Sequence, residues 1–328
     1  ARTQLWKIVN ELATARQAGQ LPDLELALYE YGKSSLPASE GHLRMIVPFT
    51  DNLDKISEEL FILETNGGEE YCGHVIDAAT KGLKWSASDG DLKLIFIAGN
   101  EPFTQGAVDY KTACAAAIQR GITVNTIYCG DRSEGISTGW EEGAKLADGS
   151  FMHIDQNQAV AAITTPYDRK LAELSGEVNE TYLFFGAAEK RETLSRRQLA
   201  QDTAAESLAL SAGAERAQFK ASGGYGFSDS DLIDALREKT VELEDLKDEQ
   251  LPKELQGKSL EEKQAVLKEK SQEREKIQNE IRKLSEQRKK YIAEKQREQT
   301  KSDVNTLDDA IIQAIRTQAQ RKRFTFEE

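Results

Sequence analysis

The run Leu92–Ala98 is the feature that most constrains the fold of this chain. It is apolar at nearly every position, is rich in β-branched and aromatic residues, and ends abruptly in Gly-Asn-Glu-Pro. Such a strand is buried on both faces, which is typical of parallel sheets. In open α/β sheets the loops beyond the carboxyl ends of the strands form the ligand crevice. The loop that starts at Asn100 is therefore where we expect the functional residues.

Helix and strand patterns alternate on both sides of this run. Strands separated by helices of about ten residues predict a doubly wound, mostly parallel sheet with helices on both faces. The first two strands along the chain, expected at 24–32 and 42–49, should instead pair with each other as a hairpin at a sheet edge. Asp51 is the expected N-cap of the second helix. The other expected strands and helices are strands at 24–32, 42–49, 122–130 and 150–155, and helices at 2–16, 53–63, 70–83, 109–120, 140–147 and 170–181.

The character of the chain changes beyond Gly186, where strand patterns stop and Ala, Gln, Glu and Arg dominate. We predict an α/β domain over residues 1–186 and an all-α extension over residues 187–328. Within the extension the expected helices lie at 189–220, at a short segment capped by Asp229 or Ser230, at about 259–299 and at about 307–321. The long charged helix would extend roughly 60 Å at 1.5 Å per residue.

The long helix carries a weak apolar seam. Ile277, Ile281, Leu284 and Tyr291 follow a seven-residue pattern, which Arg274, Arg288 and Lys295 interrupt. Three partners for the seam are open: a second chain, the 189–220 helix and the last helix. Packing within the chain is the simplest option, and a homo-oligomer formed through the extension is the alternative.

Composition excludes some classes of partner. The 328 residues carry a formal net charge of -13, which disfavours nucleic acid because phosphate binders need clustered Lys and Arg. The sequence contains no run of about 18 apolar residues, so it predicts no transmembrane segment. Cys72, Cys114 and Cys129 are too few and too scattered for a disulfide scaffold or a zinc site. A bridge between Cys72 and Cys129 remains open from sequence.

Four segments carry a family resemblance: Leu5–Leu12, Ala27–Gly32, Asn66–Gly73 and Ile95–Gly106. They are similar to segments of bacterial von Willebrand factor A domain proteins of uncharacterised function, and the resemblance covers roughly residues 1–186. In that family a doubly wound sheet presents a metal-ion-dependent adhesion site, which usually holds Mg²⁺, and partners commonly supply a carboxylate to the ion.

The sequence departs from the family pattern at the expected metal site. It begins in the helix that follows the family's Asp-x-Ser-x-Ser loop, so the resemblance implies that the natural polypeptide starts upstream with a further central strand. Glu69, Glu70 and Tyr71 stand where the family has a Thr, and Asn100 replaces an Asp. Glu69, Glu70, Asn100 and Glu101 are the candidate ligands for Mg²⁺ or another divalent cation, since such ions prefer oxygen. The alternative is that Asn100 and Glu101 cap the loop while Glu69 and Glu70 begin a helix, where negative charge suits the helix dipole.

We therefore expect a non-enzymatic module that binds a protein partner at the carboxyl edge of the sheet. His42, His74 and His153 lie in no recognisable nucleophile motif, so a hydrolase lacks an activated group. The alternative is an assembly protein in which the helical rod forms oligomers and the α/β domain is a passive head. The resemblance favours a bacterial, periplasmic or otherwise extracytoplasmic location. The expected partner-binding residues are Tyr71, Phe103, Thr104 and Gln105.

Overall fold

The structure, a computed structural model, describes residues 2–64, 67–154, 163–208, 210–222, 230–299 and 307–326. The chain divides into two compact units. Unit 1 comprises Ala1–Val160 with Val304–Glu328, and unit 2 comprises Ala161–Asp303. No helix in the described ranges is both long enough and apolar enough to cross a membrane.

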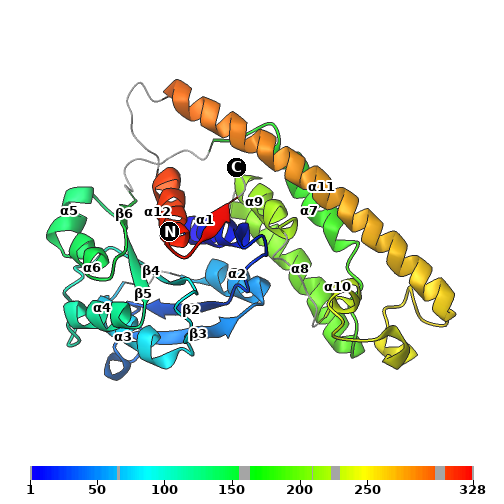
Figure 1. Ribbon diagram of the computed structural model, residues 1–328, viewed down its shortest axis with the longest axis horizontal. Helices are drawn as coiled ribbons and strands as arrows, with labels where there is room; N and C mark the ends of the chain where they lie inside the picture. The colour runs from blue at the N-terminus through cyan, green and yellow to red at the C-terminus, as the bar shows by residue number, and fades with distance from the viewer. Residues whose placement is uncertain are drawn as a thin grey trace. The chain divides into compact units, whose positions relative to one another are not determined.

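Unit 1 contains the strands predicted from sequence, arranged in separate sheets (Figure 1). An antiparallel pair joins β2 (Leu26–Tyr31) to β3 (Leu43–Thr50). A parallel sheet has the order β4 (Lys93–Gly99), β5 (Ile122–Tyr128) and β6 (Phe151–His153). A third pair, which the sequence did not predict, joins β1 (Ala15–Gln17) to β7 (Phe324–Phe326). The predicted hairpin and the predicted mixed α/β class are confirmed.

Helices of unit 1 pack on both faces of β4. Leu94 and Phe96 share a cluster with α1 and α12, whereas Ile95 and Ile97 share one with α3, α4 and α6. This alternation explains the continuous apolar run, because a strand covered on both faces needs apolar side chains at successive positions. The helices of unit 1 are α1 (Arg2–Ala13), α2 (Leu53–Ile62), α3 (Cys72–Gly82), α4 (Tyr110–Gln119), α5 (Arg132–Ser137), α6 (Trp140–Leu146) and α12 (Leu307–Arg321), with a 3₁₀ turn at Ala38–Glu40.

Side-chain caps fix where two of these helices begin. Asp109 accepts hydrogen bonds from the backbone N–H groups of Lys111 and Thr112 at the start of α4. Asn52 accepts from the N–H of Lys55 and caps α2. The prediction that Asp51 caps α2 is wrong, because the helix begins at Leu53 and its cap is the residue just before it.

Unit 2 is helical in its described part. The single helix predicted over 189–220 is two helices, α8 (Ala188–Leu208) and α9 (Leu210–Lys220). The short predicted helix is capped by Asp231, whose carboxylate accepts from the N–H of Asp234, and not by Ser230. Asp229, the other predicted cap, lies outside the described residues. The other helices are α7 (Asp168–Asn179), α10 (Leu232–Arg237) and α11 (Leu260–Gln299), with 3₁₀ turns at Leu243–Asp245 and Asp248–Gln250.

The long helix α11 runs alongside α7 and also contacts α9 (Figure 1). Ile277 and Ile281 of its seam are buried within unit 2. Packing within the chain is thus confirmed for this part of the seam. The arginines that interrupt the pattern are buried as ion pairs, Arg274 with Asp231 and Arg288 with Asp168.

The compact units differ from the boundary expected near residue 186. Leu171 and Leu174 of α7 are buried where that helix packs on α9, so α7 belongs to unit 2. The last helix was expected in the helical extension, yet Ile311 and Ile315 of α12 share an apolar cluster with α1 of unit 1. The change in composition marks where the strands end along the chain. The boundaries of the compact units depend instead on which apolar helix faces are buried together.

Candidate functional site

Glu70 joins two segments at the carboxyl end of β4. Its Oε2 atom accepts hydrogen bonds from the backbone N–H groups of Asn100 (2.9 Å) and Glu101 (3.2 Å). The backbone N–H of Glu70 donates to Oε1 of Gln105 at 2.9 Å. Three hydrogen bonds therefore hold the segment before α3 against the loop after β4.

The loop after β4 is also held from its other side. The indole N–H of Trp140 donates to the carbonyl oxygen of Glu101 at 2.9 Å. The backbone N–H of Phe103 donates to the carbonyl of Thr138 at 3.0 Å. Gln105 donates to Oε2 of Glu101 at 3.3 Å, which closes the loop on itself. The loop is thus fixed by contacts with α6 and its preceding turn as well as by Glu70.

Tyr31 and Gly99 complete the site beneath the loop. The Tyr31 hydroxyl donates to the carbonyl oxygen of Ala98 at 2.9 Å and lies 3.8 Å from Sγ of Cys72. A side chain at Gly99 would overlap the Glu70 carboxylate and crowd the Tyr31 hydroxyl. The glycine that ends β4 is therefore required by the close approach of Glu70.

Sequence reasoning missed Tyr31 and Trp140. The available signals were weak: Tyr31 ends a predicted strand, and Trp140 begins a predicted helix after Gly139. Neither position shows which backbone carbonyl the side chain will reach. Tertiary structure alone brings both residues to the loop after β4.

Burial dominates the electrostatics of the site. It raises the pKa of Glu70, and the hydrogen bonds from the Glu101 and Asn100 amides partly oppose this rise. Burial also raises the pKa of the Cys72 thiol well above its ordinary value. Reactive cysteines have lowered pKa values because the thiolate is the nucleophile. Cys72 is consequently a poor candidate for nucleophilic chemistry.

Three of the four predicted metal ligands already accept hydrogen bonds near the loop after β4. The Tyr71 hydroxyl donates to the Glu69 carboxylate, Glu70 accepts from two amides, and Glu101 accepts from Gln105. Within the described ranges, no group of three or more His, Cys, Asp or Glu side chains is placed to hold a metal ion. The proposals below require no metal ion.

The four predicted partner-binding residues separate into different environments. Thr104 is exposed, whereas Tyr71 and Gln105 are half-buried. Phe103 is 0% exposed, with ring centroids 5.3 Å from Tyr110 and 4.8 Å from Trp140. The prediction that Phe103 contacts a partner is wrong, because the loop folds its ring into the core.

All three cysteines are free thiols. Cys72 and Cys114 are fully buried, and Cys129 is half-buried at the end of β5. The bridge between Cys72 and Cys129 that the sequence left open is not formed. Burial among apolar side chains is the ordinary environment of such residues.

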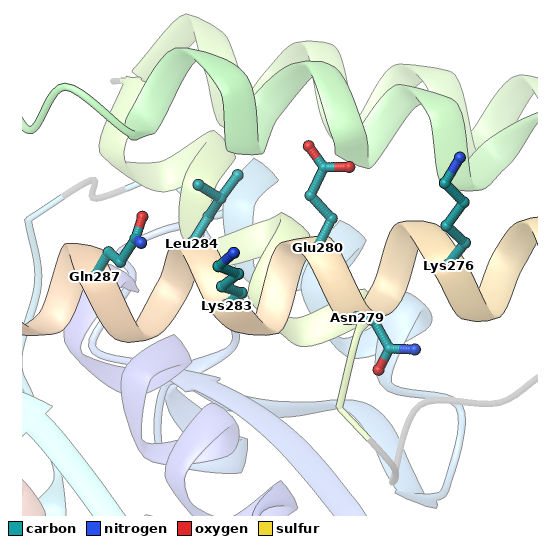
Figure 2. Close-up of a pocket in the computed structure, with 6 residues that line it drawn as sticks. All are labelled: Lys276, Asn279, Glu280, Lys283, Leu284 and Gln287. Carbon is teal, nitrogen blue, oxygen red and sulfur yellow. The ribbon is translucent and has the colours of Figure 1, made fainter.

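A surface hollow of about 500 Å³ lies along α11 in unit 2. Figure 2 shows Lys276 and Glu280 pointing to one side of the helix and Asn279 pointing to the other. One helix supplies the whole lining, which consists of Lys276, Asn279, Glu280, Lys283, Leu284 and Gln287. Ligand sites usually combine apolar walls with polar groups that converge from several elements. The loop after β4 is the better candidate site.

We expect the Glu70→Gln variant to gain stability relative to the wild type as the pH rises from about 4 to 7. Because the folded-state pKa of Glu70 is raised above its ordinary value of 4.5, its contribution to stability is present below that value and is lost as the pH rises through the folded pKa. Glutamine keeps an oxygen that accepts from the amides of Asn100 and Glu101 but does not ionise. Denaturant unfolding at several pH values, followed by tryptophan fluorescence, measures the difference.

Glu40→Gln is the control for this experiment, because Glu40 is exposed. Its stability difference from the wild type should change little with pH. A difference for Glu70→Gln that is flat, or that falls as the pH rises, would contradict the assigned environment of Glu70.

The sequence matches no family model, and no curated protein or solved structure is significantly similar to it. Identification with the von Willebrand factor A family thus stays an expectation from the quoted segments.

Proposed function

We propose that unit 1 is a non-enzymatic protein-binding module that contacts its partner through the loops at the carboxyl end of β4. The observation that carries this proposal is the hydrogen-bond network of Glu70, Gln105 and Trp140, which fixes these loops. A surface ordered before binding loses less conformational entropy when the partner docks. The side chains of Glu69, Asn100 and Thr104 are exposed beside this network, and we call these three the rim residues.

The charge of this edge favours a basic partner. Burial, then Glu134, and to a smaller extent Glu101 and Glu70 raise the pKa of Tyr128 to about 12. These carboxylates from three segments therefore lie near one ring. Complementary charge increases association rates and selects among partners. We infer that the partner presents Lys or Arg side chains to the rim.

The chemistry of the neighbouring side chains also supports binding over catalysis. Burial keeps Cys72 protonated, and His42 is hydrogen-bonded through Nδ1 to the carbonyl of Leu36 at 2.9 Å. A nucleophile needs a lowered pKa or an adjacent base. The von Willebrand factor A resemblance and its doubly wound sheet are consistent with this proposal and form part of it.

Assembly through the helical rod is the less supported alternative. Ile277 and Ile281, the buried part of the α11 seam, already pack within unit 2. A dimer formed through those two residues would have to displace this packing.

A capture experiment tests the proposed contact surface. The full chain, immobilised and exposed to an extract of its source cells, should lose its bound protein when the three rim residues are changed to alanine. A matched control changes three exposed polar residues at the amino ends of the strands, and it should keep the bound protein with an unchanged melting temperature. The control residues are Ser86, Asp91 and Gln119. Retention by the rim variant, or equal loss by both variants, would contradict the proposal.

A further inference from the structure

The second half of α11 carries a charge opposite to that of the whole chain. Over residues 260–280 Glu slightly outnumbers Lys and Arg together, in keeping with a chain of formal net charge -13. Over residues 281–293 Glu286 is the only acidic residue, whereas five positions hold Lys or Arg. This part of the helix is therefore a basic segment in an acidic protein.

Four of these five cations are exposed to solvent. The fifth, Arg288, is buried in its ion pair with Asp168 of α7. The exposed four form two pairs that are seven residues apart. Residues seven apart lie on the same side of a helix, about 10 Å from each other along its axis. We call the exposed four the basic face, which consists of Arg282, Lys283, Lys289 and Lys290.

The basic face has no carboxylate partner among the described residues. Arg282 donates to the carbonyl oxygen of Ala221 at 2.8 Å and to Oδ1 of Asn279 at 2.7 Å, and neither acceptor is charged. The three lysines form no ion pair with any residue that the structure describes. Elsewhere on α11 lysines are paired, as Lys263 is with Asp248 at 2.9 Å. The positive charge of the basic face is thus left for a binding partner.

The helix beneath the basic face is firmly held within unit 2. Ile281 is buried, and Arg288 and Asp168 are joined at 2.7 Å. Gln278 donates to the carbonyl oxygen of Lys220 at the end of α9, at 3.0 Å. A surface that is fixed before binding loses less conformational entropy when a partner docks.

An apolar contact is available beside these charges. The hollow along α11 adjoins the basic face, because Lys283 lines both (Figure 2). Leu284 also lines the hollow and is half-buried. Protein interfaces combine apolar groups at the centre with polar groups around them. The composition of this surface therefore suits a protein partner.

Unit 1 carries a surface of complementary composition at the carboxyl end of its parallel strands. Glu69 and Glu134 are exposed there, and Glu101 is half-buried. Ile136 of α5, two residues after Glu134, is a large apolar side chain that is 38% exposed. Each copy of the chain thus presents acidic groups with an apolar neighbour on one unit, and basic groups with an apolar neighbour on the other.

We propose that the partner of the rim is a second copy of this chain, which binds there through its basic face. This inference rests on the proposed function and names the partner of that same surface. Because one surface contacts a different surface of the next copy, association is head to tail and gives a ring or an open chain. It leaves the buried seam residues Ile277 and Ile281 packed within unit 2.

The charge pattern favours a protein over a polyphosphate. Glu286 is exposed and lies between the two halves of the basic face along the helix. A nucleic acid or an anionic membrane would bring closely spaced phosphates against this carboxylate. Carboxylates that project singly from a folded protein can contact the lysines on either side of it.

Sedimentation velocity of the full chain over a concentration series tests the proposal. The wild type should associate as its concentration rises, and less so at high salt. One variant reverses the basic face through Lys283→Glu, Lys289→Glu and Lys290→Glu, and the other reverses the acidic edge through Glu69→Lys and Glu134→Lys. Each variant alone should associate at least about tenfold more weakly than the wild type, because like charges then face each other. An equimolar mixture of the two should associate again, which a contact within one chain cannot produce.

The control variant reverses three other exposed lysines of unit 2 and has the same net charge as the basic-face variant. It should associate like the wild type, and its residues are Lys253, Lys258 and Lys268. A wild type that stays monomeric, a mixture that stays monomeric, or equal loss in the control would overturn the proposal. So would binding of duplex DNA or of anionic vesicles through the basic face without self-association. If the chain is monomeric but still captures a different protein through the rim residues, this inference fails while the proposed function stands.

Discussion

Replacing Phe103 with alanine is expected to lower the free energy of unfolding of unit 1 by about 3–5 kcal/mol. The ring is fully buried and packs edge-on against Tyr110 and Trp140. Its removal takes away the transfer free energy of a large apolar group and leaves a cavity that the neighbouring rings cannot fill without moving. Tryptophan fluorescence during denaturant unfolding reports on unit 1, because all three tryptophans belong to it.

Thr104→Ala is the matched control, since Thr104 is the next residue and its side chain is exposed. Its effect on the free energy of unfolding should lie within about 0.5 kcal/mol. This pair of variants separates two roles for the loop after β4. A Phe103→Ala protein of unchanged stability would place the ring outside the core and restore it as a candidate contact for a partner.

Replacing Asp231 with alanine is expected to destabilise unit 2 by about 3–5 kcal/mol. Asp231 is 0% exposed, and its two carboxylate oxygens accept from Arg274 at 2.8 and 3.1 Å. The same carboxylate accepts the backbone N–H groups of Leu183 (2.7 Å) and Asp234 (3.1 Å). The variant would leave the buried guanidinium without its bidentate partner and would remove the cap of α10.

The two units allow this loss to be located. Unit 2 contains no tryptophan, so its unfolding appears in far-UV circular dichroism while tryptophan fluorescence follows unit 1. Arg237→Ala is the control. Arg237 forms an ion pair with Asp234, but its side chain is 62% exposed, so its loss should lower the free energy of unfolding by only about 0–1 kcal/mol. Equal effects of the two substitutions would show that the Arg274 network adds nothing beyond a surface ion pair.

Local patterns were sufficient to predict most helices and strands of this chain. The apolar run at β4, the alternation in β2 and the amphipathic pattern of α12 each depend on neighbouring residues alone. The start of α4 near Asp109 was predicted for the same reason. The cap of α2 was misplaced by one residue, which reflects how weakly sequence fixes the first turn of a helix.

Predictions that depend on distant contacts were less successful. Phe103 follows a proline in a loop, and no local pattern indicates that its ring lies between Tyr110 and Trp140. Arg274 and Arg288 looked like interruptions of an apolar seam, since sequence does not show the carboxylates that neutralise them. Glu70 was identified as a site residue, but its use as an acceptor for two backbone amides follows only from the tertiary structure.

Capture of a partner by the full chain tests most directly whether the loops at the carboxyl end of β4 form the contact surface. The variant with alanine at the rim residues Glu69, Asn100 and Thr104 should lose the bound protein. The control variant with alanine at Ser86, Asp91 and Gln119 should keep it. Retention of the bound protein by the rim variant would contradict the account.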